Sequence, residues 1–184
     1  GAFVSFPAML GLAFVAKEFV LILLGEKWLD SVPFLQLFCL WGAMGYLSQL
    51  YVNLLMTYSR SDVYLSGMIL IGLLQILVVW ILYPFGVFNM VIGYICVYFF
   101  SILFWHYSVK EELPIKLISI CKDIVPYLVI SIFVFFVVDC VLRNISDVYM
   151  LLILKILFSS ALYILILLLL KSTILKEAIS YLKR

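Results

Sequence analysis

Val63–Val109 reads VYLSGMILIGLLQILVVWILYPFGVFNMVIGYICVYFFSILFWHYSV and contains no Asp, Glu, Lys or Arg. A helix needs about 20 mostly apolar residues to cross the hydrocarbon layer of a bilayer, so this stretch is long enough for two crossings. Tyr83-Pro84-Phe85-Gly86 supplies the break between them, because proline cannot continue a helix interior and glycine favours a turn. The stretch therefore predicts two membrane-spanning helices joined by a tight turn.

The composition of the whole chain agrees with this start. Of its 184 residues, 67% are hydrophobic and 12% are charged, whereas soluble domains are about 45–50% apolar and about 25% charged. The net charge of +2 is too small for a nucleic-acid-binding protein, which needs many phosphate-neutralising cations. The apolar runs are continuous and do not alternate with polar residues, which favours helices over barrel strands. We therefore expect an all-α integral membrane protein with no nucleic-acid partner.

The remaining charge-poor stretches divide in the same way. They give about six spans, at 3–24, 33–57, 63–83, 87–108, 124–142 and 149–170. Residues 1–170 are thus predicted to form a six-span bundle, followed by a basic amphipathic tail at 171–184. A second amphipathic piece, 114–123, fits a helix lying in the headgroup layer or an ordinary positively charged membrane edge. Because the chain begins with Gly1 and lacks a signal-peptide pattern, we expect a piece of a longer protein.

Basic residues predict the orientation of the spans, because they gather in cytoplasmic loops. If the chain starts inside, the outer loops carry only Lys27 and Arg143. The inner loops and the tail then carry Arg60, Lys110, Lys116, Lys122, Lys171, Lys176, Lys183 and Arg184. This bias predicts that the 109–123 loop and the carboxyl terminus are cytoplasmic.

Charged residues inside a span need a physical reason, since a charge at the bilayer centre costs about 2.5–3.5 kcal/mol on insertion scales. Lys17 and Glu18 interrupt the first span. Either one of them lines a water-filled path, or both lie near the outer interface with Lys17 extended towards water. Lys155 is expected to extend to the outer interface in the same way. Asp139 and Arg143, one helical turn apart, are expected to form a pair at the helix edge.

Uncharged polar residues are the other candidates for function. Gln49 and Asn53 are four residues apart and share a helix face, so they either join helices by hydrogen bonds or line a polar lumen. His106 can relay protons, or it is part of an aromatic belt beside Trp105 and Tyr107. We predict a substrate cavity that includes Lys17, Gln49 and Asn53.

The sequence gives little support for a catalytic site. The four cysteines stand far apart, His106 is the only histidine, and no glycine-rich phosphate loop or nucleophile–histidine–acid set is present. These patterns predict no enzyme activity, no catalytic residue, no metal site and no cofactor.

Several short motifs resemble a known family. They are Pro7-Ala8-Met9-Leu10-Gly11-Leu12, Leu23-Leu24-Gly25-Glu26-Lys27-Trp28, Val32-Pro33-Phe34-Leu35-Gln36, Ser59-Arg60-Ser61-Asp62, Pro84-Phe85-Gly86 and Ile92-Gly93. In order and spacing they resemble the C-terminal portion of bacterial Wzx-type polysaccharide flippases, which export O-antigen, capsule or teichoic acid. The resemblance covers most of residues 1–110. Family members often have a glycine at the position of Ser59, and Lys17 is an unusual charge.

The resemblance implies a two-bundle transporter of the superfamily that also holds MATE drug exporters. Its substrate would be an undecaprenyl-pyrophosphate-linked oligosaccharide, flipped across the bacterial cytoplasmic membrane by alternating access for surface polysaccharide biosynthesis. A polysaccharide polymerase and glycosyltransferases would be its partners, beside membrane lipid.

Other functions remain open at this point. A MATE-like antiporter for small cations would favour carboxylates within the membrane, of which Glu18 is the candidate. A non-catalytic membrane subunit, or a membrane enzyme of the polyprenyl-sugar pathway, is the further alternative.

Overall fold

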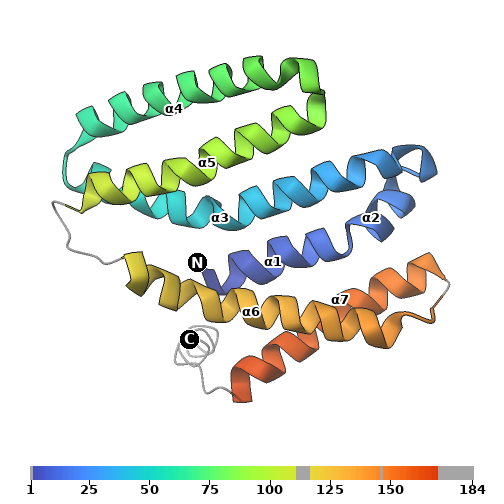
Figure 1. The fold of residues 1–184 in the computed structure, drawn as a ribbon. Helices are drawn as coiled ribbons and strands as arrows, with labels where there is room; N and C mark the ends of the chain where they lie inside the picture. Colours follow the sequence, from blue (N-terminus) through green and yellow to red (C-terminus); the bar gives the residue numbers. More distant parts are fainter. Residues whose placement is uncertain (1, 111–116, 146, 170–184) are drawn as a thin grey trace.

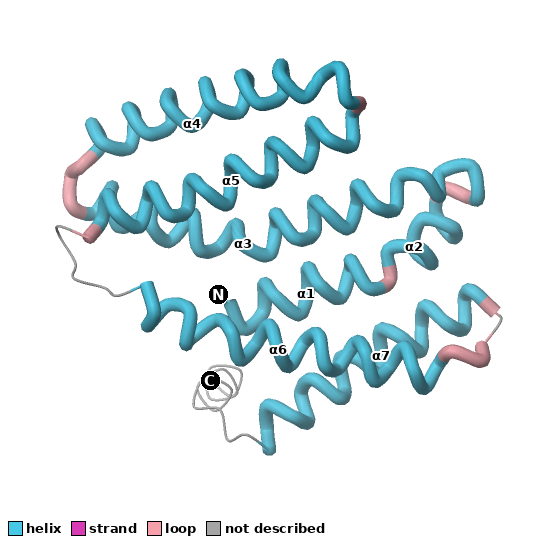
Figure 2. Tube along the Cα trace, in the orientation of Figure 1, coloured by secondary structure: helices cyan, strands magenta, loops and turns pink. Residues whose placement is uncertain are grey.

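The computed structural model describes residues 2–110, 117–145 and 147–169. The described residues form helices joined by short loops, and no strand occurs among them (Figures 1 and 2). The predicted all-α fold class is confirmed. The predicted tail at 171–184 lies outside the described residues.

The first predicted span is not one straight helix. It consists of α1 (Ala2–Phe14) and α2 (Ala16–Leu23), whose axes differ by 61°. A short 3-10 helix, η1 (Glu26–Ser31), then leads into α3 (Val32–Thr57). Gly25 makes this turn possible because its φ of 86° lies in the left-handed region that favours glycine.

The break predicted at Tyr83–Gly86 separates α4 (Ser61–Leu82) from α5 (Val87–Val109). Tyr83–Phe85 form the 3-10 turn η2, and Gly86 has a φ of 94°. The two helices approach closely at Gly93, where an added Cβ would collide with Leu82 and Val78.

The last two helices are α6 (Leu117–Leu142) and α7 (Val148–Leu169). Residues 117–123, predicted as part of a separate surface helix, instead continue directly into α6. Residues 114–116 lie outside the described part of the chain.

Contacts between elements place the helices in a row, in the order α4, α5, α3, α1, α6, α7 (Figure 1). Because α6 packs on α1 and not on its sequence neighbour α5, the chain crosses from one side of α3 to the other after α5. Beyond α1, the half-helix α2 packs against α7. The broken first span therefore lies in the middle of the row, between the α3–α5 and the α6–α7 halves.

Four helical segments of the described chain are long and apolar enough to cross a membrane: Ser61–Phe85, Val87–Val109, Ile124–Leu142 and Val148–Leu169. The bent pair α1–α2 makes a fifth if it counts as one broken span. α3 has sufficient length and no charged residue, but it is less apolar than these segments and is not among them. The span predicted at 33–57 therefore stays a prediction.

Candidate functional site

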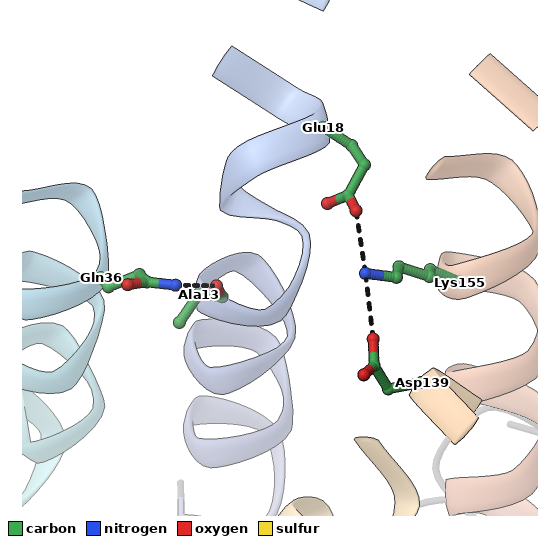
Figure 3. A network of polar contacts seen from close by, with 5 residues as sticks. All are labelled: Ala13, Glu18, Gln36, Asp139 and Lys155. Atoms are coloured by element: carbon green, nitrogen blue, oxygen red, sulfur yellow. Dashed lines mark hydrogen bonds and ion pairs between the residues drawn. The ribbon is translucent and has the colours of Figure 1, made fainter. Parts of the chain in front are cut away.

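The bend between α1 and α2 occurs at Val15, where the sequence has neither proline nor glycine. Val15 has φ −96° and ψ 8°, in the sparsely populated bridge region. Carbonyls in the last turn of a helix lack partners within that helix. One of them, on Ala13, accepts a hydrogen bond from Gln36 Nε2 of α3 at 3.2 Å (Figure 3). A side chain from a neighbouring helix therefore stabilises the break from outside.

On the other side of the break, an ion cluster joins three helices (Figure 3). Lys155 Nζ of α7 donates a hydrogen bond to Glu18 Oε1 of α2 at 2.9 Å. The same ammonium lies 3.4 Å from Asp139 Oδ1 of α6. It also lies 4.4 Å from the centroid of the Phe14 ring, a cation–π distance. Lys155 thus contacts both halves of the broken helix and α6.

Burial differs among the three charged residues. Glu18 and Lys155 are 6% and 7% exposed, whereas the side chain of Asp139 is 63% exposed. Removing one partner from a buried ion pair leaves an uncompensated charge, which costs about 3–5 kcal/mol. Glu18 and Lys155 therefore depend on each other more strongly than Asp139 depends on either.

The cluster is incompletely satisfied. Glu18 Oε2 and Ser159 Oγ are buried and have no hydrogen-bond partner within the described residues. With two carboxylates around one ammonium, the formal charge of the cluster is −1. The lysine is therefore already neutralised, and the cluster does not provide a positive site for an anionic headgroup.

A cavity of about 500 Å³ lies between α1, α6 and α7, next to the ion cluster. Lys155, Ser159, Ser160 and Tyr163 contribute its polar side chains, and Phe14 is among its apolar ones. The cavity suits an apolar group with a single polar end better than a hydrated headgroup.

Of the three predicted cavity residues, the structure brings together Gln49 and Asn53 but not Lys17. Lys17 is exposed on α2, while Gln49 and Asn53 are exposed on α3 and hydrogen-bonded to each other at 3.2 Å. Gln36 lies where α3 passes the break. At a helix rise of 1.5 Å per residue, Gln49 is about 20 Å further along α3. None of the three predicted residues lines the cavity beside Lys155. Their role in a substrate path stays a prediction.

Two expectations about charged residues are wrong. Lys155 is buried and does not extend to the interface, because Glu18 and Asp139 surround its ammonium. Among the described residues, Asp139 pairs with Lys155 of the neighbouring helix and not with Arg143. A sequence signal existed: Glu18, Asp139 and Lys155 all lie near the predicted outer ends of their spans, with opposite charges.

A second polar contact joins α3 and α5. Tyr51 Oη and His106 Nδ1 are 2.9 Å apart, and both residues are buried. They lie in an apolar cluster with Leu55 and Trp105. His106 is therefore part of a helix–helix contact, whereas the proton-relay and aromatic-belt interpretations stay predictions.

Comparisons with known proteins point to one class. Residues 1–33 match the model of a family described as polysaccharide biosynthesis protein. The chain is 44% identical over 61 residues to an uncharacterized membrane protein in the cps region of Klebsiella pneumoniae, a match covering 33% of this chain and 13% of that protein. It is 40% identical over 60 residues to the lipopolysaccharide biosynthesis protein WzxC of Escherichia coli (strain K12), covering 33% of this chain and 12% of that protein. No solved structure matches at a significant level.

The fold and these matches together define a multi-pass, all-α membrane protein that is similar in part of its sequence to polysaccharide biosynthesis proteins. More particularly, the resemblance to Wzx-type proteins is confirmed over the matched stretches. Those stretches span only a small part of the length of these relatives.

Proposed function

We propose that this chain forms part of a flippase that moves a polyprenyl-diphosphate-linked oligosaccharide across the bacterial cytoplasmic membrane by alternating access. The observation that carries the proposal is the similarity to WzxC in a chain built of apolar helices. Under this proposal the carboxyl terminus is cytoplasmic, as the distribution of basic residues predicts.

The physical problem of such a substrate fits the polar residues of α3. A sugar headgroup cannot cross hydrocarbon unaided, because its polar groups lose their hydrogen bonds with water. α3 carries the exposed amides of Gln49 and Asn53, and no charged residue. Such a face offers hydrogen bonds without a strong field, which suits neutral sugars. The diphosphate needs cations, and Lys17 is an exposed candidate within the predicted spans.

A flippase for lipid-linked oligosaccharide is preferred to an antiporter for small cations because of the position of Glu18. An antiporter needs a carboxylate that is free to exchange cations, whereas Glu18 is bonded to Lys155 at 2.9 Å. A transporter is preferred to a membrane enzyme because the similarity is to a Wzx-type protein.

The test is surface display of polysaccharide by cells whose only copy of the encoding gene carries K17A, Q49A or N53A. We expect reduced display and accumulation of the lipid-linked oligosaccharide in the cytoplasmic leaflet. Asn89→Ala is the matched control, since Asn89 is an exposed amide that bonds only to the Phe85 carbonyl of its own helix turn. Normal display by a strain lacking the gene would refute the flippase. Normal display by all three variants would refute only the assigned path.

A further inference from the structure

The ion cluster has a feature that a simple structural ion pair lacks. Lys155 Nζ lies between two carboxylates on different helices, 2.9 Å from Glu18 and 3.4 Å from Asp139. One carboxylate belongs to α2, which follows a bend, and the other to α6, an uninterrupted helix. A movement of α2 would therefore separate Lys155 from one partner while leaving the other in place.

α2 is attached to the bundle in a way that permits such a movement. It has eight residues, and Val15 joins it to α1 with backbone angles outside the regular helical region. Its buried residues are Ala16, Glu18 and Val20, so Glu18 provides its buried polar contact. The exposed residues Lys17 and Phe19 face away from the bundle.

Two details lower the free energy needed to separate Glu18 from Lys155. Glu18 Oε2 has no hydrogen-bond partner in the described structure, so the closed arrangement does not fully satisfy the carboxylate. Lys155 keeps Asp139 and the Phe14 ring after release, so no isolated ammonium remains buried. Because Asp139 is largely exposed, it offsets part of the penalty that breaking a buried ion pair normally carries.

We propose that Lys155 is a charge-exchange latch, which holds α2 against α7 through Glu18 and passes to Asp139 when α2 swings about Val15. The latch controls the position of the half-helix α2. That the swing accompanies substrate movement rests on the proposed function, whereas the latch itself does not.

The latch predicts opposite effects for its two carboxylates. Glu18→Gln removes the ion pair that holds α2 closed, so the swung-out arrangement becomes more populated. Asp139→Asn removes the alternative partner of Lys155, so release would leave the ammonium unpaired and the closed arrangement becomes more populated. A purely structural cluster would instead loosen in both variants.

The experiment measures the distance between nitroxide labels on α2 and α7 in the reconstituted full-length protein without substrate. The labels replace Leu23 and Tyr149, which are exposed on these helices, in a background lacking the four native cysteines. We expect Glu18→Gln to increase the population with the longer label distance by about tenfold. A change of this size is what the usual coupling energy between charged residues in contact would produce. Asp139→Asn should decrease that population relative to the parent protein.

Labels at Leu65 and Tyr107, exposed on α4 and α5, are the control pair and should give the same distances in every variant. If Glu18→Gln fails to fold, Glu18→Asp replaces it, because the shorter side chain weakens the same contact. A change of the same sign in the Glu18 and Asp139 variants, or no change in either, overturns the latch. Because no substrate is present, neither result bears on whether the protein is a flippase.

Discussion

Glu18 and Lys155 are 137 positions apart in the sequence, yet Lys155 Nζ donates a hydrogen bond to Glu18 Oε1 at 2.9 Å. The contact joins the half-helix α2, which follows the break at Val15, to α7, the last described helix. It converts two residues that are individually unfavourable in a membrane into one stabilising pair, and this sets the first prediction.

Lys155→Met should lower the free energy of unfolding by about 3–5 kcal/mol, because it leaves the buried Glu18 carboxylate without its cation. The double variant Glu18→Gln/Lys155→Met should recover most of this loss, since neither buried charge remains. Both changes are measured by unfolding the protein, dissolved in a mild detergent, while circular dichroism reports the loss of helix. Equal stability of Lys155→Met and the parent protein would show that the ion pair does not form.

Gln36→Leu should lower the free energy of unfolding by about 1 kcal/mol, the usual net contribution of one hydrogen bond. The variant removes the donor to the Ala13 carbonyl at the break. Gln75→Leu is the control, because Gln75 is a glutamine of α4 that is less exposed than Gln36 and does not contact the break. The same unfolding assay should find its effect within about 0.5 kcal/mol, and equal losses in both variants would argue against a specific role for Gln36.

Ser59→Gly should raise the stability by about 1 kcal/mol. Ser59 has a φ of 56°, in the left-handed region that costs L-residues about 1–2 kcal/mol and glycine almost nothing. This is the position at which the resembling family often has glycine. Ser61→Gly, inside the first turn of α4, is the control and should not stabilise the protein. A lower melting temperature of Ser59→Gly would contradict the backbone assignment.

Gly93→Ala should destabilise the protein by about 1–3 kcal/mol, the usual cost of overpacking. The new Cβ would collide with Leu82 and lie 2.7 Å from Val78 Cγ1, which forces α4 and α5 apart. Gly72→Ala is the matched control, since no heavy atom lies within 4 Å of its added Cβ. Alanine favours helices over glycine by about 1 kcal/mol, so this control should be slightly more stable than the parent protein.

The sequence allowed the helical class and the turn at Tyr83–Gly86 to be predicted, because both depend on local signals. Charge-free apolar runs define helices in a membrane, and proline with glycine marks a break. The bend at Val15 has no such signal, because neither proline nor glycine stands at that position. The hydrogen bond that satisfies the Ala13 carbonyl at the bend comes from Gln36 of another helix, which sequence spacing does not reveal.

The ion cluster was missed for a related reason. For Glu18, Lys155 and Asp139, sequence spacing reveals only the neighbours on the same helix and the nearest interface. Their pairing depends on the order of helices in the row, in which α6 and α7 pack beside the broken first span. Nothing local in the sequence specifies that α6 crosses to α1 and does not remain beside α5.

The long separation between Glu18 and Lys155 also has a consequence for biogenesis. A ribosome adds about 5–20 residues per second, so the separation of 137 positions between the two partners corresponds to roughly 7–27 s of synthesis. During that interval the Glu18 carboxylate has been made while its cation has not. The insertion machinery, or water at the membrane surface, must therefore shelter the first helix pair until α7 arrives and completes the bundle.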